Sequence, residues 1–65
     1  MKYTPEQYKN MVEYISSSML MCEIKNSRVL KNLEDEQELI TMHEELEKKI
    51  LECIHLISDI EEKLP

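Results

Sequence analysis

The sequence predicts an all-α fold, an antiparallel two-helix hairpin that dimerises into a four-helix bundle. Two long segments carry apolar residues at every third or fourth position, the spacing of an amphipathic helix. The phase of that pattern changes near the middle of the chain, which predicts a turn there. The apolar surfaces are wider than two helices can cover, which predicts the pairing of two hairpins. We expect one domain over residues 1–65, with helices at about 5–31 and 35–63 and a turn at about 32–34.

The start of the first helix is marked by its local sequence. Thr4 is expected at the N-cap, Pro5 at the first helical position, and Gln7 where its side chain reaches back to the cap. The residues expected to face another helix follow with spacings of four and three: Tyr8, Val12, Ile15, Met19, Cys22, Asn26, Val29 and Leu33. Asn26 is the polar member of this row. A buried asparagine there is expected to fix register and partner number, and a helix kink is the alternative.

The second helix is expected to begin at about residue 35, where residues 35–38 are similar to a capping box and Asn32 or Asp35 is the expected cap. Its row has the same spacing: Leu39, His43, Leu46, Ile50, Cys53, Ile57, Ile60 and Leu64. His43, the polar member, is expected to be partly buried and hydrogen-bonded. Continuing the first row in a straight helix would instead select Glu36, Ile40, His43 and Glu47. Two of those four are glutamates, so a turn is favoured over a continuous bent helix.

These two rows predict an oligomer seam formed by Ile15, Met19, Cys22, Asn26, Leu46, Ile50, Cys53 and Ile57. The apolar face of the second helix is wider than this seam, because it also includes Ile40, Ile54, Met42 and Leu56. A lone hairpin would leave this surface in water, so it is expected to meet a second hairpin in a homodimer, and a different protein is the alternative. The spacing of Cys22 and Cys53 matches no CxxC pattern, and we interpret both as small, reduced core residues.

Composition excludes several function classes. The chain has no glycine, so neither the P-loop nor the GxGxxG dinucleotide-binding loop can form. No apolar run approaches the roughly 20 residues of a membrane span, and the N-terminal segment lacks the pattern of a signal peptide. A cytoplasmic protein without membrane contact is therefore expected.

Catalytic and metal-binding patterns are weak. Glu52 and His55 form a Glu-x-x-His, the ligand pair of di-iron bundles, but the heptad places both on the solvent side. His43 and Glu47 stand four residues apart without an evident third metal ligand. The serines at 16–18 have no neighbouring histidine to activate a hydroxyl. We therefore expect no enzyme, no cofactor and no bound metal.

Charge is distributed unevenly along the chain. The net charge is -6, with +1 over residues 1–30 and -7 over residues 31–65. The acidic residues expected to form a partner-binding face are Glu34, Asp35, Glu36, Glu44, Glu45 and Glu47. The predicted function is that of a small, non-enzymatic acidic regulator or inhibitor that binds another macromolecule. Nucleic-acid mimicry toward a basic nucleic-acid-binding protein is one such mode, and the composition suits a phage or mobile-element product. A merely solvated helix face is the alternative.

Two other functions stay open. One is a structural subunit or chaperone of a larger helical assembly. The other comes from the outline of the chain, which resembles the Rop-type plasmid RNA-binding dimer in its length and its two similar helices. This resemblance implies an RNA-binding hairpin dimer, with Lys2, Lys9, Lys25 and Arg28 as the basic residues, although the net charge disfavours direct nucleic-acid binding. Residues 35–39 also resemble part of the Ser-Gln-Glu-Leu-Asp stretch of small helical-hairpin sporulation phosphatases, without its serine and terminal aspartate.

Overall fold

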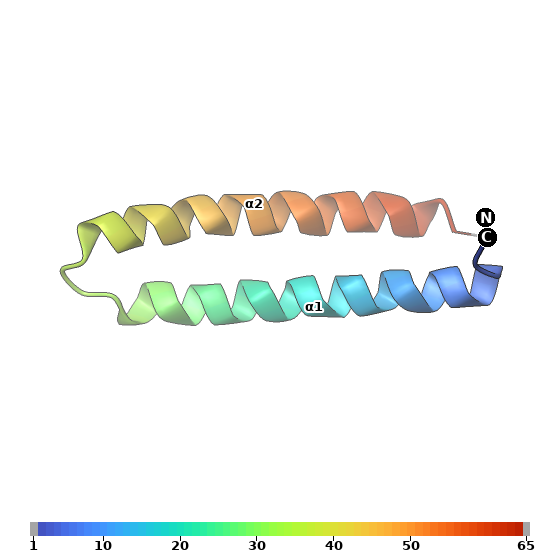
Figure 1. The fold of residues 1–65 in the computed structure, drawn as a ribbon. Helices are drawn as coiled ribbons and strands as arrows, with labels where there is room; N and C mark the ends of the chain where they lie inside the picture. Colours follow the sequence, from blue (N-terminus) through green and yellow to red (C-terminus); the bar gives the residue numbers. More distant parts are fainter. Residues whose placement is uncertain (1, 65) are drawn as a thin grey trace.

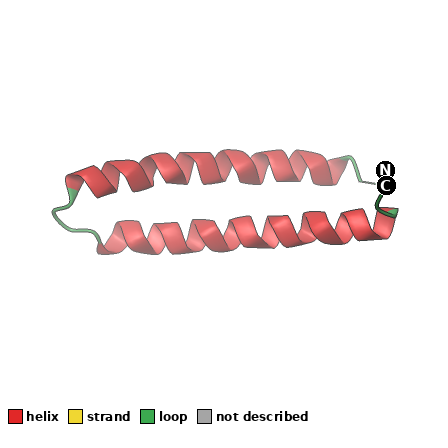
Figure 2. Ribbon diagram, viewed as in Figure 1, coloured by secondary structure: helices red, strands yellow, loops and turns green. Residues whose placement is uncertain are grey.

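Two antiparallel helices joined by a short turn make up the computed structural model, which describes residues 2–64 (Figure 1). Helix α1 spans Pro5–Asn32 and helix α2 spans Gln37–Glu62. The helices lie side by side along their length, and the chain enters and leaves the hairpin at the same end (Figure 1). Residues 2–64 contain helix and loop but no strand (Figure 2). The predicted all-α hairpin is confirmed, and a continuous bent helix is excluded.

The N-terminus of α1 forms the predicted capping box. The Gln7 backbone N–H donates to Thr4 Oγ1 over 3.1 Å, and the Thr4 backbone N–H donates to Gln7 Oε1 over 3.0 Å. Pro5 takes the first helical position, where its missing N–H leaves no acceptor unpaired. These contacts are local in sequence, so they form without help from the second helix.

The turn lies at 33–36, so it begins one residue later and ends two residues later than predicted. Asn32 belongs to α1, where its Nδ2 donates to the backbone oxygen of Arg28 over 2.7 Å. The residue that precedes α2 is Glu36, and its side chain makes no capping bond to the helix. Instead the Glu36 carboxylate accepts from the Glu34 N–H over 3.0 Å, and the Asp35 carbonyl accepts from the Gln37 N–H over 2.9 Å. The prediction of Asn32 or Asp35 as the cap was therefore wrong, because these residues serve the end of α1 and the turn.

The helices pack through four residues that are almost fully buried. Val12, Ile50 and Ile57 are 5–7% exposed, and Asn26 is 5% exposed. The half-buried positions on either side of them include Ser16, Glu23 and Leu30 in α1, and Ile40, Glu47 and Ile54 in α2.

Half of the predicted seam lies outside the interface between α1 and α2. Ile15, Cys22, Leu46 and Cys53 are exposed, whereas Met19 is half-buried and Asn26, Ile50 and Ile57 are buried. In each helix, two neighbouring rows of residues have heptad spacing, and both rows include the buried residues of that helix. The interface between α1 and α2 is formed by one of the two rows in each helix. Ile40 and Ile54, which were expected to lie in water, are therefore half-buried against α1.

Candidate functional site

One face of the hairpin is apolar and uncovered. We define the open face as the exposed apolar residues at heptad spacing beside the helix interface: Ile15, Cys22 and Val29 of α1, and Leu39, Leu46 and Cys53 of α2. Met11, Met42 and Leu56 stand three or four residues from these and lie along the edges of the face. A groove of about 370 Å³ between the helices, lined by Cys22, Val29 and Leu46, shows that both helices contribute to the same face.

The opposite face of the hairpin is more polar. Its central positions include Ser16, Glu23 and Ser27, and the Ser27 hydroxyl donates to the Glu23 carboxylate over 3.1 Å. Leu20 and Leu51 are exposed apolar residues on this side, 50% and 43% exposed. On the open face, exposed apolar residues recur every seven residues along each helix and form a continuous row. This continuity distinguishes the open face from the opposite face.

A polar cluster lies at the centre of the interface between α1 and α2. Asn26 Nδ2 donates to Glu47 Oε2 over 2.9 Å and to the backbone oxygen of His43 over 3.0 Å. Asn26 Oδ1 lies 2.7 Å from His43 Nδ1. The Asn26 side chain therefore uses both its donor and its acceptor groups on α2, which explains how a buried amide is accommodated.

The cluster also determines which ring nitrogen of His43 carries a hydrogen. Asn26 Oδ1 can only accept, so His43 Nδ1 carries a hydrogen and donates it. In the neutral ring the lone pair is then on Nε2, and no hydrogen bond among residues 2–64 involves that atom. The hydrogen bonds of this cluster form only when Asn26 lies opposite the turn of α2 that runs from His43 to Glu47. The cluster thus sets the alignment of α1 on α2.

The cluster changes the interpretation of three residues. Asn26 and His43 lie between the helices as the sequence predicts, and α1 continues unbroken through Asn26 to Asn32. Glu47, which was predicted on the acidic face, is half-buried and bound to Asn26. The pattern that could have revealed this is the position of Glu47 on the straight continuation of the first row, four residues after His43.

The other predicted acidic residues are exposed. Glu34, Asp35 and Glu36 lie in the turn, and Glu44 and Glu45 lie on α2. Glu45 makes an ion pair with Lys49 at 3.7 Å, and both side chains are well exposed. The structure therefore separates the predicted acidic face into a turn group and a helix group, with Glu47 in neither.

The turn contains a carboxyl group whose pKa the fold lowers, that of Glu36. Backbone N–H groups of Glu36, Glu34 and Asp35 hold the pKa of the Glu36 carboxyl below its ordinary value of 4.5. The largest of these effects comes from the backbone of Glu36 itself. This carboxylate orders the turn from a solvent-exposed position.

Residues considered for metal or redox chemistry are dispersed. Glu52 and His55 are both exposed on α2. Among residues 2–64, no three His, Cys, Asp or Glu side chains come close enough together to hold a metal ion. Cys22 and Cys53 are free thiols on the open face, so neither lies in the core of a single hairpin. Both thiols lie beside the interface between α1 and α2, and Cys22 lines the groove there with Leu46 of the other helix.

The fold and site define an all-α helical hairpin with one uncovered apolar face. Comparisons of the chain with protein-family models, curated proteins and solved structures found no match. Neither α1 nor α2 is long and apolar enough to cross a membrane.

Proposed function

We propose that the protein is a non-enzymatic interaction protein that pairs through its open face into a homodimeric four-helix bundle. In this state it presents acidic outer surfaces to a second macromolecule, as a regulator or inhibitor. The observation that carries the proposal is the continuous open face, which both helices form beside their interface and which a single hairpin leaves uncovered.

The size of the hairpin supports a second copy as the occupant of this face. The apolar residues buried within one hairpin are Val12, Ile50 and Ile57, and a single core in a chain this short rarely supplies more than about 3–5 kcal/mol. The hairpin measures 49 by 17 Å across its broad side, so the open face is a long, narrow area that a second hairpin matches in its dimensions. A second identical face would cover that area and complete a core.

Matched leucines on α2 test the pairing. Leu46 lies on the open face and Leu51 on the opposite face, and they are 45% and 43% exposed in the hairpin. Leu46→Glu should dissociate the dimer, because it places a charge in the interface, whereas Leu51→Glu should leave the dimer intact. Sedimentation equilibrium measures both. A folded wild-type monomer of 7.8 kDa, or equal effects of the two substitutions, would overturn the proposed homodimer.

Charge supports a basic partner for the outer surface. Residues 31–65 carry a net charge of -7, and Glu44 and Glu45 project from α2 away from the polar cluster. Electrostatic attraction would speed association with a basic surface and would weaken as salt is added. A basic nucleic-acid-binding protein fits this chemistry, and the protein would then compete with DNA for it.

Charge reversal tests that part of the proposal. Glu44→Lys with Glu45→Lys should abolish retention of a basic protein partner in a pull-down, and wild type should release it at high ionic strength. Glu61→Lys with Glu62→Lys, at the end of the same helix, provides a control of equal charge change. Retention of the same partner by the Glu44/Glu45 variant at both salt levels would exclude the acidic surface. A partner lost with Leu46→Glu alone would favour a subunit of a larger helical assembly.

A further inference from the structure

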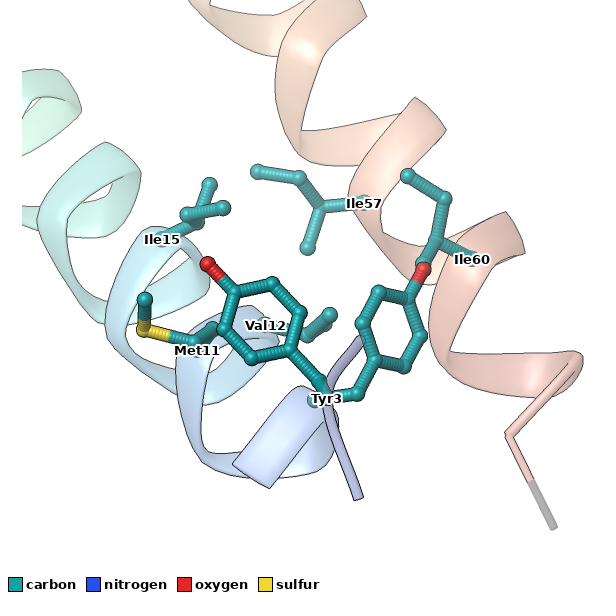
Figure 3. A pocket seen from close by; sticks show the side chains of 7 residues that line it. Tyr3, Met11, Val12, Ile15, Ile57 and Ile60 are labelled. Atoms are coloured by element: carbon teal, nitrogen blue, oxygen red, sulfur yellow. The ribbon is translucent and has the colours of Figure 1, made fainter. Parts of the chain in front are cut away.

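The open face is not uniform along its length. At the end of the hairpin opposite the turn, an apolar hollow of about 310 Å³ opens between the helices (Figure 3). Met11 and Ile15 of α1 lie on one side of it, and Ile57 and Ile60 of α2 lie on the other (Figure 3). Its walls are almost entirely apolar, so it would accept hydrocarbon side chains.

The other end of the open face has the complementary feature. Near the turn, Val29, Leu39 and Met42 are 39%, 46% and 60% exposed. Leu39 and Met42 stand three residues apart on α2, so they project from neighbouring positions on one side of the helix. A pair of exposed apolar side chains therefore lies at one end of the face and a hollow at the other.

We propose that Leu39 and Met42 of a second copy fill this hollow, in a dimer whose two turns lie at opposite ends. This pairing rests on the homodimer of the proposed function and specifies its orientation. Two-fold symmetry makes the contact twice, because each copy offers both the hollow and the side chains that fit it. With the turns at the same end, hollow would face hollow, and both would stay unfilled.

Charge favours the same orientation. Glu34, Asp35 and Glu36 in the turn and Glu38 at the start of α2 place four acids within five residues. Pairing with the turns together would bring two such groups side by side. Opposite ends separate them by about the 49 Å length of the hairpin, several times the screening length of about 8 Å in physiological salt. Each acidic turn would then lie at an end that carries the exposed bases Lys2 and Lys63 as well as the acids Glu61 and Glu62, in place of a second group of acids alone.

Distances between turns test the orientation directly. Asp35→Cys, in a chain with Cys22→Ala and Cys53→Ala, provides one spin-label site per copy. The expected distance between labels in the dimer is close to the hairpin length of 49 Å. A distance of roughly 10–20 Å, as for neighbouring helix ends, would overturn the orientation and leave the homodimer standing. A monomer of the native-cysteine protein in sedimentation equilibrium would overturn both.

Substitutions test the contact itself in the chain with its native cysteines. Met42→Glu should raise the dimer Kd roughly tenfold or more, because it directs a carboxylate into the apolar hollow. Thr41→Glu is the control, since the neighbouring Thr41 is exposed beside Glu44, Glu45 and Lys48. Adding Met11→Lys to Met42→Glu should restore much of the affinity if the two positions meet across the interface. Equal effects at positions 41 and 42, or no recovery in the double variant, would overturn the proposed contact.

Discussion

The buried amide of Asn26 makes a sharp prediction about what holds the hairpin in alignment. Asn26→Asp keeps the size and shape of the side chain and replaces its NH₂ group with an oxygen. The two bonds that Asn26 Nδ2 donates, to Glu47 Oε2 at 2.9 Å and to the His43 backbone oxygen at 3.0 Å, become contacts between oxygens. The bond accepted from His43 Nδ1 at 2.7 Å survives.

The expected cost follows from these contacts. A hydrogen bond to a charged group contributes about 1.5–3 kcal/mol and one to a neutral carbonyl contributes about 1 kcal/mol. Repulsion between the new carboxylate and Glu47 adds to the loss, and a stronger, charge-assisted bond from His43 offsets part of it. We expect a net loss of about 2–4 kcal/mol per chain at neutral pH. The loss should shrink in acid, where one carboxyl group takes up a proton and donates in place of the missing N–H.

Urea unfolding followed by circular dichroism measures this cost. Asn10 is exposed on the same helix, and Asn10→Asp should change stability by less than about 0.5 kcal/mol. Adding Glu47→Gln to Asn26→Asp exchanges donor and acceptor, because the new amide can donate to the new carboxylate. The double variant should recover most of the lost stability. Equal costs at positions 10 and 26, together with no recovery, would refute the role assigned to the cluster.

Three further outcomes are expected. Ile50→Ala should cost about 2–5 kcal/mol in urea unfolding because Ile50 is 6% exposed, and a loss no larger than that of Leu51→Ala would contradict the assigned core. Thr4→Ala removes the Oγ1 that accepts from Gln7 and should cost about 0.5–2 kcal/mol, with a corresponding drop in Tm. The lowered pKa of Glu36 means that its carboxylate contributes stability above pH 4.5, which is lost as the pH falls through the folded value. Glu36→Gln should therefore flatten the acid limb of the stability–pH curve, and parallel curves for variant and wild type would argue against this role.

The sequence by itself determined the helices and one of their ends. The three- and four-residue spacing of apolar side chains predicts two long helices, because that spacing is a property of the helix alone. The capping box of Thr4 and Gln7 formed as predicted, since its partners are three residues apart. The sequence placed the turn within two residues, but it did not identify the residue that precedes α2. The Asn32 and Glu36 side chains instead bond to backbone groups, and a sequence pattern does not show which of these bonds will form.

Only the tertiary structure decided which row of each helix faces the other. Leu39, Leu46 and Cys53 form one candidate row of α2, and Ile40, Glu47 and Ile54 form its neighbour. Apolar content favours the first row, yet the hairpin buries part of the second. The reason is Asn26, which donates to Glu47 from a position 21 residues away and makes a glutamate acceptable between the helices. Periodicity assigns each side chain to a face of its own helix, whereas the hydrogen bonds that satisfy a buried polar group come from the other helix.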